Sequence, residues 1–330
     1  MQWQPRSRRK KRRARIRWVR LFAVAFGAAL IVTGAWQIIG YASEYLSSQQ
    51  TAQKLRQAIN SLPTNAPVAL ATPAATPAPI IAPSPTAGPP AVSPKAATAK
   101  PTPAASAEPK QVLPKAAYPL NPQLEMDNRF RHLRKESPDL VGWLTINTLL
   151  DEPVVQRDNV YYLTRDAMKK QNVNGAIFLD AAVSLRSRPY TLILYGHNMK
   201  TGAMFGNLRN FENGSYYRSN PFITFDTLYE EGRYVVFSAG VISTEEKVKN
   251  YVDFLSFFSP VVQERQSAID ALISASVHNC TVDVEPGDQL LLLVTCAEKD
   301  SERRVIAARR LRDGETEQGL KKQVEKSWKK

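Results

Sequence analysis

Short apolar, β-branched runs separated by turn residues fill most of the chain after residue 118. Such runs, bounded by Gly, Pro, Asn and Asp, are typical of strands. They lie at residues 143–147, 153–156, 176–179, 191–195, 222–225, 234–239, 290–295 and 305–308. Helical patterns occupy residues 124–135 and 251–277. The pattern predicts a mostly β fold, a barrel with added helices, over residues 118–312, and a polar tail or surface helix over 313–330.

The N-terminus carries a different pattern. Residues 21–41 contain no charged side chain, and a helix of that length rises roughly 30 Å, the thickness of a bilayer's hydrocarbon core. Ten Lys and Arg side chains precede it within the basic arm, residues 1–20. Such a block stays in the cytoplasm, so we expect a single transmembrane signal anchor with the rest of the chain outside the cell. A cleaved signal peptide is the alternative.

Residues 42–117 join this anchor to the barrel domain. Up to residue 62 the apolar positions have helical spacing, which predicts a short helical stalk. From there to residue 114 Pro, Ala, Thr and Ser dominate, and such a segment cannot bury enough apolar surface to fold. At about 3 Å per residue, this linker is long enough to hold the domain well over about 100 Å from the membrane.

The charge of the chain is unevenly distributed. A net charge of +14 at first suggests a nucleic-acid partner. Subtracting the ten charges of the basic arm from +14 leaves +4 for the rest of the chain, which is ordinary for a soluble domain. The basic character therefore belongs to the anchor, and no nucleic-acid partner is expected.

Three strand ends carry the side chains of an acyl-transfer site. His197 and Cys296 each follow an apolar strand, and Arg303 and Arg304 begin the next one. A thiol nucleophile, an imidazole acid–base group and a cation for a developing oxyanion are the parts that acyl transfer needs. From the residues alone, Cys296 also fits a small buried hydrophobe and His197 a structural histidine. No Cys or His spacing matches a metal site, so no metal is predicted.

The strings around these residues resemble the sortases, class B in particular. They are NGAIFLD at 174–180, LYGHNMKTGAMFGNL at 194–208, LLLVTC ending at 296 and RRVIAAR from 303. The resemblance implies Cys296 as nucleophile, His197 as proton donor and acceptor, and no cofactor. It implies Arg303 as the oxyanion stabiliser because an Ala stands five places on, at residue 308. Arg304 remains the alternative.

The resemblance also implies a function in the bacterial cell membrane. A sortase cleaves a C-terminal sorting signal of an exported protein through a thioester and passes the acyl group to an amine. Asn198, Val294 and Thr295 are candidate substrate contacts, and Val294 stands where class B often has Ser. The amine acceptor is expected to be peptidoglycan or its precursor. A pilin-polymerising sortase, a cysteine hydrolase and a catalytically idle, membrane-tethered binding module remain open.

Four other residues are given core, surface or site-shaping roles. His132 and His278 are expected to face solvent, and Cys280 is expected to be structural. Met204 either shapes the site or belongs to the core.

Overall fold

The computed structural model describes residues 26, 30–33, 35–36, 40, 43, 46–47, 49–60, 110–296 and 301–329. The predicted basic arm, most of the predicted anchor over 21–41 and the linker segment over 61–109 lie outside these residues. None of the helices in the described ranges is long and apolar enough to cross a bilayer.

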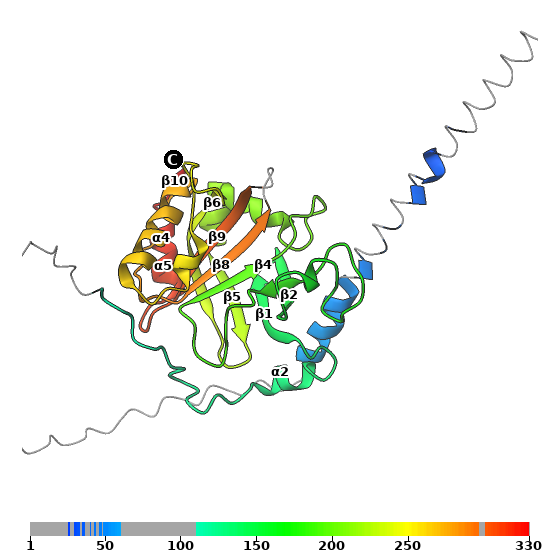
Figure 1. Ribbon diagram of the computed structural model, residues 1–330, viewed down its shortest axis with the longest axis horizontal. Helices are drawn as coiled ribbons and strands as arrows, with labels where there is room; N and C mark the ends of the chain where they lie inside the picture. Colours follow the sequence, from blue (N-terminus) through cyan, green and yellow to red (C-terminus); the bar gives the residue numbers. More distant parts are fainter. Residues whose placement is uncertain are drawn as a thin grey trace, which may run out of the picture.

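Eight strands close into a barrel in the order β1-β2-β3-β4-β8-β9-β6-β5 (Figure 1). They are β1 (Leu140–Ile146), β2 (Leu150–Val155), β3 (Ile177–Leu179), β4 (Thr191–Tyr195), β5 (Phe222–Thr227), β6 (Arg233–Ser243), β8 (Leu290–Cys296) and β9 (Glu302–Arg310). Closure pairs every strand on both sides and leaves no open edge. Each of the eight predicted apolar runs falls on one of these strands, so the prediction of a mostly β barrel is confirmed.

The core of the barrel is built on the strand that ends at Cys296. The four leucines Leu290 to Leu293 are all fully buried, because this strand lies between β4 and β9 and both of its faces are covered. β4 runs parallel to β8, whereas β9 runs antiparallel to it. The same end of the barrel therefore collects the end of β4, the end of β8 and the start of β9.

The prediction of a single helix over residues 251–277 is wrong. The structure has a short 3-10 helix, η3 (Phe254–Phe257), followed by α4 (Val262–Ala275). Pro260 separates them, because it lacks a backbone N–H and disfavours the helical conformation of the residue before it. α4 packs on β6, where the Ser238 hydroxyl donates to the Leu272 carbonyl oxygen at 2.6 Å. A side chain at Gly240 would collide with the carbonyl oxygen of Ala275, so glycine permits this close packing.

The helix expected over residues 124–135 is shorter in the structure. α2 (Asn128–Leu133) begins where the Asp127 side chain accepts the backbone N–H of Arg129 at 2.7 Å. This N-cap fixes the start of the helix, and Leu124, with a φ of 52°, lies outside it. Shorter elements connect the strands: η1 (Tyr161–Leu163), η2 (Gly206–Glu212) and α3 (Gly214–Ser219).

The C-terminal residues form a surface helix rather than a loose tail. α5 (Glu317–Val324) buries Leu320 and Val324, and β10 (Trp328–Lys329) pairs with β7 (His278–Asn279). Glu315 accepts from the fully buried guanidinium of Arg309 at 2.7 Å. A buried charge requires a partner, so this contact holds the tail to β9.

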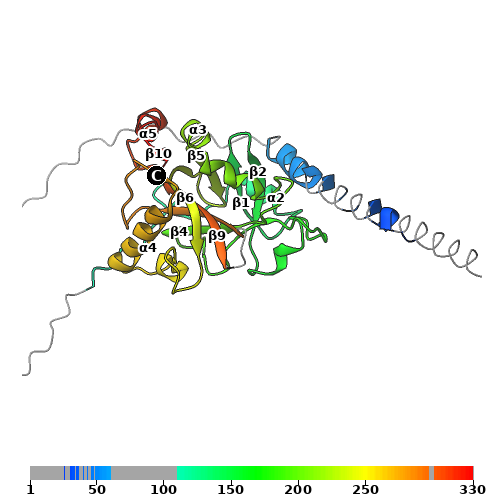
Figure 2. The ribbon, with the colours of Figure 1, turned by 90° about the horizontal axis from the view of Figure 1, so that it is seen from above.

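The N-terminal helix of residues 49–60 lies on the opposite side of the barrel from α4 and α5 (Figure 2). It falls within the predicted helical stalk. The helix packs against the barrel near β1 and β2, where Arg56 forms an ion pair with Asp151 at 3.0 Å.

Candidate active site

The register of β8 and β9 pairs two of the predicted site residues directly. Cys296, the last residue of β8, lies opposite Arg303 of β9, and Thr295 lies opposite Arg304. Directly paired positions of an antiparallel sheet share a face, and successive positions alternate faces. Arg303 therefore occupies the face of position 296, and Arg304 occupies the other face.

The two arginines also differ in their side-chain partners. The Nε of Arg304 lies 2.6 Å from a carboxylate oxygen of Glu212, at the end of η2, and the Arg304 side chain is 11% exposed. The Arg303 side chain is only partly buried, and its Nη1 donates to the carbonyl oxygen of Glu302 at 2.9 Å. Arg304 is thus engaged in an ion pair that joins β9 to η2.

His197 leaves β4 next to the end of β8. Tyr195 pairs with Val294 in the parallel register, and the Gly196 N–H donates to the Val294 carbonyl oxygen at 3.3 Å. Two residues further along, the chains reach His197 and Cys296. The structure therefore brings the three predicted catalytic positions to adjacent strand ends.

The imidazole of His197 is held by a backbone carbonyl. Its Nε2 lies 2.7 Å from the carbonyl oxygen of Leu163, in η1. Because a carbonyl oxygen only accepts, Nε2 must carry a proton, and Nδ1 is the ring nitrogen that can exchange one.

The loop that carries His197 is tightly folded. The Phe205 N–H donates to the His197 carbonyl oxygen at 3.0 Å, and Asn198 forms a β-bridge with Met204. A side chain at Gly206 would collide with the carbonyl oxygen of Met199. Met204 adopts a φ of 49°, in the left-handed region that is uncommon for a residue with a Cβ. Met204 is buried and belongs to the core.

The three candidate substrate contacts lie in different surroundings. Asn198 is partly exposed in the loop after His197. Val294 is buried and shares the face of position 296, two residues away. Thr295 is buried on the other face, and among the described residues its hydroxyl has no hydrogen-bond partner.

A Tyr–Asp pair beside the site was not predicted. The Tyr195 hydroxyl donates to Asp180 Oδ2 at 2.9 Å, and the Asn159 amide donates to the same oxygen at 3.2 Å. Burial, followed by the charge of Asp180, raises the pKa of Tyr195, while the positive charge of Arg303 opposes the shift. Both residues lie in the quoted strings, but only the pairing of β3 with β4 shows that they meet.

His132, His278 and Cys280 differ in how far they are exposed to solvent. His132 is exposed, as predicted. The expectation for His278 is wrong: it is 1% exposed, its Nε2 lies 2.6 Å from the Phe211 carbonyl oxygen, and its ring stacks on Tyr217. The imidazole is buried against η2 and α3, which supply Phe211 and Tyr217. The Cys280 Sγ lies 3.8 Å from the Ser276 hydroxyl.

Within the described ranges, no group of three or more His, Cys, Asp or Glu side chains is arranged to hold a metal ion.

Comparisons with known proteins agree with this geometry. The family model for the sortase domain matches residues 145–311. Sortase B of Listeria monocytogenes is 31% identical over 202 residues, which cover 59% of this chain and 78% of the relative. Sortase B of Staphylococcus aureus is 33% identical over 178 residues, covering 53% and 70%.

Solved structures give the same result. Sortase B of Bacillus anthracis in complex with AAEK2 aligns with a TM-score of 0.51 and 28% identity, over 62% of this chain and 89% of that one. The S. aureus sortase B–substrate complex aligns with a TM-score of 0.50 and 28% identity, over 58% and 88%. The chain therefore belongs to the sortase family. Its relatives place it in class B, and it is a cysteine transpeptidase.

Proposed function

We propose that this protein is a membrane-anchored sortase that cleaves the sorting signal of exported proteins and joins them to an amine of the cell wall. Cys296 is the nucleophile, His197 the proton donor and acceptor, and Arg303 the oxyanion stabiliser. The single observation that carries this assignment is the register that sets Cys296 against Arg303 and brings the end of β4, with His197, beside them.

The proposed reaction has two halves. The Cys296 thiolate attacks the carbonyl carbon of the cleaved peptide bond, and the Arg303 guanidinium stabilises the oxyanion that forms. Collapse of the tetrahedral intermediate breaks the C–N bond, and His197 Nδ1 gives its proton to the leaving amine. The acceptor amine then attacks the thioester, loses a proton to His197, and the thiolate departs. The hydrogen bond from Nε2 to Leu163 persists in both charge states of the ring.

The anchor is supported by the sequence and by the few side chains described there. The uncharged stretch over 21–41 is long enough to span a bilayer and follows ten basic residues. Phe26, Ile31 and Trp36 are each more than 60% exposed. Large apolar side chains exposed along one segment are suited to a lipid environment.

The test uses the full chain in detergent with a fluorescent peptide that carries a Pro-containing sorting signal with Thr at the cleavage position. With triglycine present, we expect a transpeptidation product that Cys296→Ala abolishes. Cys280→Ala is the matched control and retains activity. Cleavage that persists in Cys296→Ala contradicts the proposal.

A second series of reactions identifies the acceptor. Transfer to triglycine in preference to a lysine-containing pilin peptide supports wall anchoring. The reverse preference supports pilus assembly, and release by water alone makes the protein a hydrolase.

A further inference from the structure

Both ends of the Pro- and Ala-rich segment, residues 61–109, are attached to the barrel. On one side residue 60 ends the N-terminal helix, which lies near β1 and β2. On the other side residues 110–113 bind the start of α4. There Lys110 pairs with Glu264 at 3.2 Å, and the Leu113 N–H donates to the Pro260 carbonyl oxygen at 2.8 Å. Figure 2 shows the N-terminal helix and α4 on opposite sides of the molecule.

The helix is fixed to the barrel by an apolar face and by polar contacts. Ala52, Leu55 and Ile59 follow helical spacing and are all buried, and Leu55 and Ile59 join the barrel's core cluster. Arg56 pairs with Asp151, and its guanidinium lies 5.3 Å from the ring centroid of Trp143. These contacts join the helix to β1 and β2.

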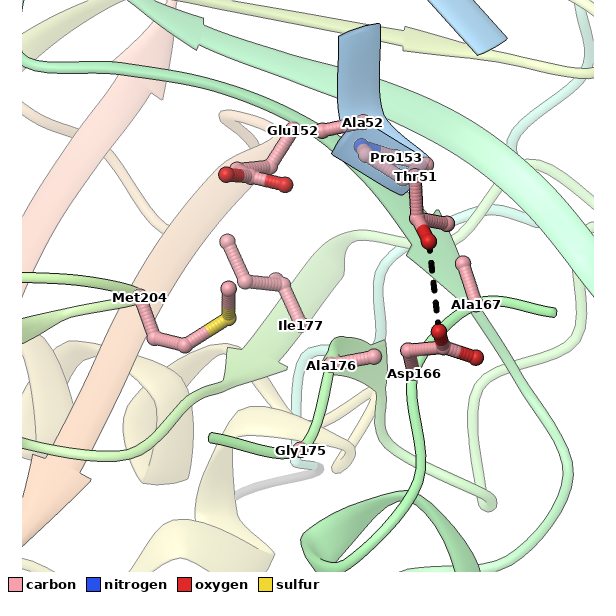
Figure 3. A pocket seen from close by; sticks show the side chains of 10 residues that line it. All are labelled: Thr51, Ala52, Glu152, Pro153, Asp166, Ala167, Gly175, Ala176, Ile177 and Met204. Atoms are coloured by element: carbon pink, nitrogen blue, oxygen red, sulfur yellow. Dashed lines mark hydrogen bonds between the residues drawn. The ribbon is translucent and has the colours of Figure 1, made fainter. Parts of the chain in front are cut away.

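A small cavity of about 10 Å³, roughly the space of one water molecule, lies beneath the helix. Thr51 and Ala52 form one wall, and the Thr51 hydroxyl donates to Asp166 at 3.2 Å. Figure 3 shows the side chains of Ile177 and Met204 below that wall, with Glu152 to one side of it.

Residues of both the N-terminal helix and the loop that carries His197 line this cavity. Met204, which lines it, is a non-glycine residue with a left-handed backbone in the loop that carries His197. A backbone conformation of this kind persists when the surrounding packing holds it. Thr51 and Ala52 of the N-terminal helix line the same cavity as Met204, so the helix borders the space beside the Met204 side chain.

We propose that residues 49–60 form a docking helix that can dissociate from the barrel. When docked, the helix restrains the loop that carries His197 through Met204. The segment 61–109 is long enough to keep the helix connected to the barrel when it dissociates. The effect of the docked helix on catalysis rests on the proposed role of His197 as proton donor and acceptor. A linker of this composition gives a high effective concentration, so the helix docks on its own barrel rather than on a second copy. Docked, it keeps the barrel beside the anchor. When the helix is released, a segment of 49 residues allows a separation of up to about 150 Å, at about 3 Å per residue.

Hydrogen exchange on the full chain in detergent tests docking without any assay of activity. We expect residues 49–60 to be protected in the wild type. Leu55→Gln removes the central buried side chain and should raise their exchange at least about tenfold. In the same variant, exchange over residues 198–206 should rise severalfold, since Met204 loses its support. Gln53→Ala, on the exposed face of the same helix, is the matched control and should change neither region.

Two results would overturn the proposal. Exchange of residues 49–60 at the rate of an unfolded peptide in the wild type means that the helix does not dock. The second result is a helix that is protected in the wild type and exchanges faster in Leu55→Gln, while exchange over residues 198–206 is unchanged in that variant. This means that the helix docks but does not restrain the loop. Both results are independent of sorting-signal cleavage, so they are distinguishable from a failure of the proposed function.

Discussion

Arg303 lies directly opposite Cys296 in the antiparallel register of β8 and β9, while its neighbour Arg304 pairs with Thr295 and binds Glu212. Strand alternation thus separates two adjacent arginines that the sequence leaves nearly equivalent. One shares the face of the proposed nucleophile. The other ties β9 to η2.

Replacement of the two arginines should have opposite consequences. Arg303→Ala should lower kcat/KM for sorting-signal cleavage by about 10²–10³, the usual cost of removing an oxyanion donor, with little loss of thermal stability. Arg304→Ala should retain cleavage within a few fold and lower the Tm, because Glu212 loses its partner. We would measure peptide cleavage and thermal unfolding on both variants and on Glu212→Gln to check these two expectations. A larger loss of activity in Arg304→Ala would reverse the assignment.

Replacement of His197 should affect substrates according to their leaving groups. With a peptide substrate, His197→Ala should lower kcat by about 10²–10⁴, because the departing amine needs a proton. With an activated ester of the same sorting signal, the leaving group departs without protonation and the loss should be much smaller. Steady-state kinetics on the two substrates give the comparison. Equal losses on both would show that His197 does not act as the acid.

The strands of the fold were predictable because their signals are local. The leucine run of β8 and the strand before His197 have strand composition and end at turn or polar residues. The break at Pro260 was also readable, since proline rarely continues a helix, although the apolar spacing on both sides predicted one element. The roles of Cys296, His197 and Arg303 stay predictions, but their proximity follows from the register.

Long-range contacts were not predictable in the same way. Leu55 and Ile59 are visible as apolar positions at helical spacing, but nothing local shows that they pack against a barrel whose first strand begins at Leu140. The contact between Tyr195 and Asp180 depends on the pairing of β3 with β4. The burial of His278 depends on Phe211 and Tyr217, more than 60 residues earlier in the chain. Periodicity indicates which face of an element is apolar, not which surface covers it.

Arg265 should be a major determinant of stability. Its fully buried guanidinium donates to Pro286 O, Thr191 Oγ1 and Phe257 O, so it ties α4, β4 and η3 together. Burial lowers the pKa of Arg265 to about 10, so the group remains charged at neutral pH.

Arg265→Leu should therefore destabilise the protein by about 2–4 kcal/mol, because buried acceptors lose their donors. Arg265→Lys should not restore the loss, since an ammonium cannot reproduce the planar set of donors. Denaturant unfolding measures both variants. Gln263→Leu, at an exposed position of the same helix, should stay within about 0.5 kcal/mol, and an equal effect in this control would contradict the role of Arg265.

Glu152 should make the stability of the folded protein depend on pH. Burial, and then the negative charge of Asp151, raises the pKa of Glu152 to about 8 from its ordinary value of 4.5. The charged groups around it are Asp151 on its own strand, Asp166 across the cavity and Arg56 on the helix, which pairs with Asp151.

Because the folded protein holds this proton up to a higher pH than the unfolded chain does, the stability that Glu152 contributes is fully present below about pH 4.5. It weakens as the pH rises toward 8 and levels off above it. Glu152→Gln keeps the shape of the side chain and removes the titration. We expect the Tm of the wild type to fall relative to that of Glu152→Gln between pH 5 and pH 8, with a constant difference at higher pH. A difference that does not vary with pH would mean that the pKa of Glu152 is not raised in the folded protein.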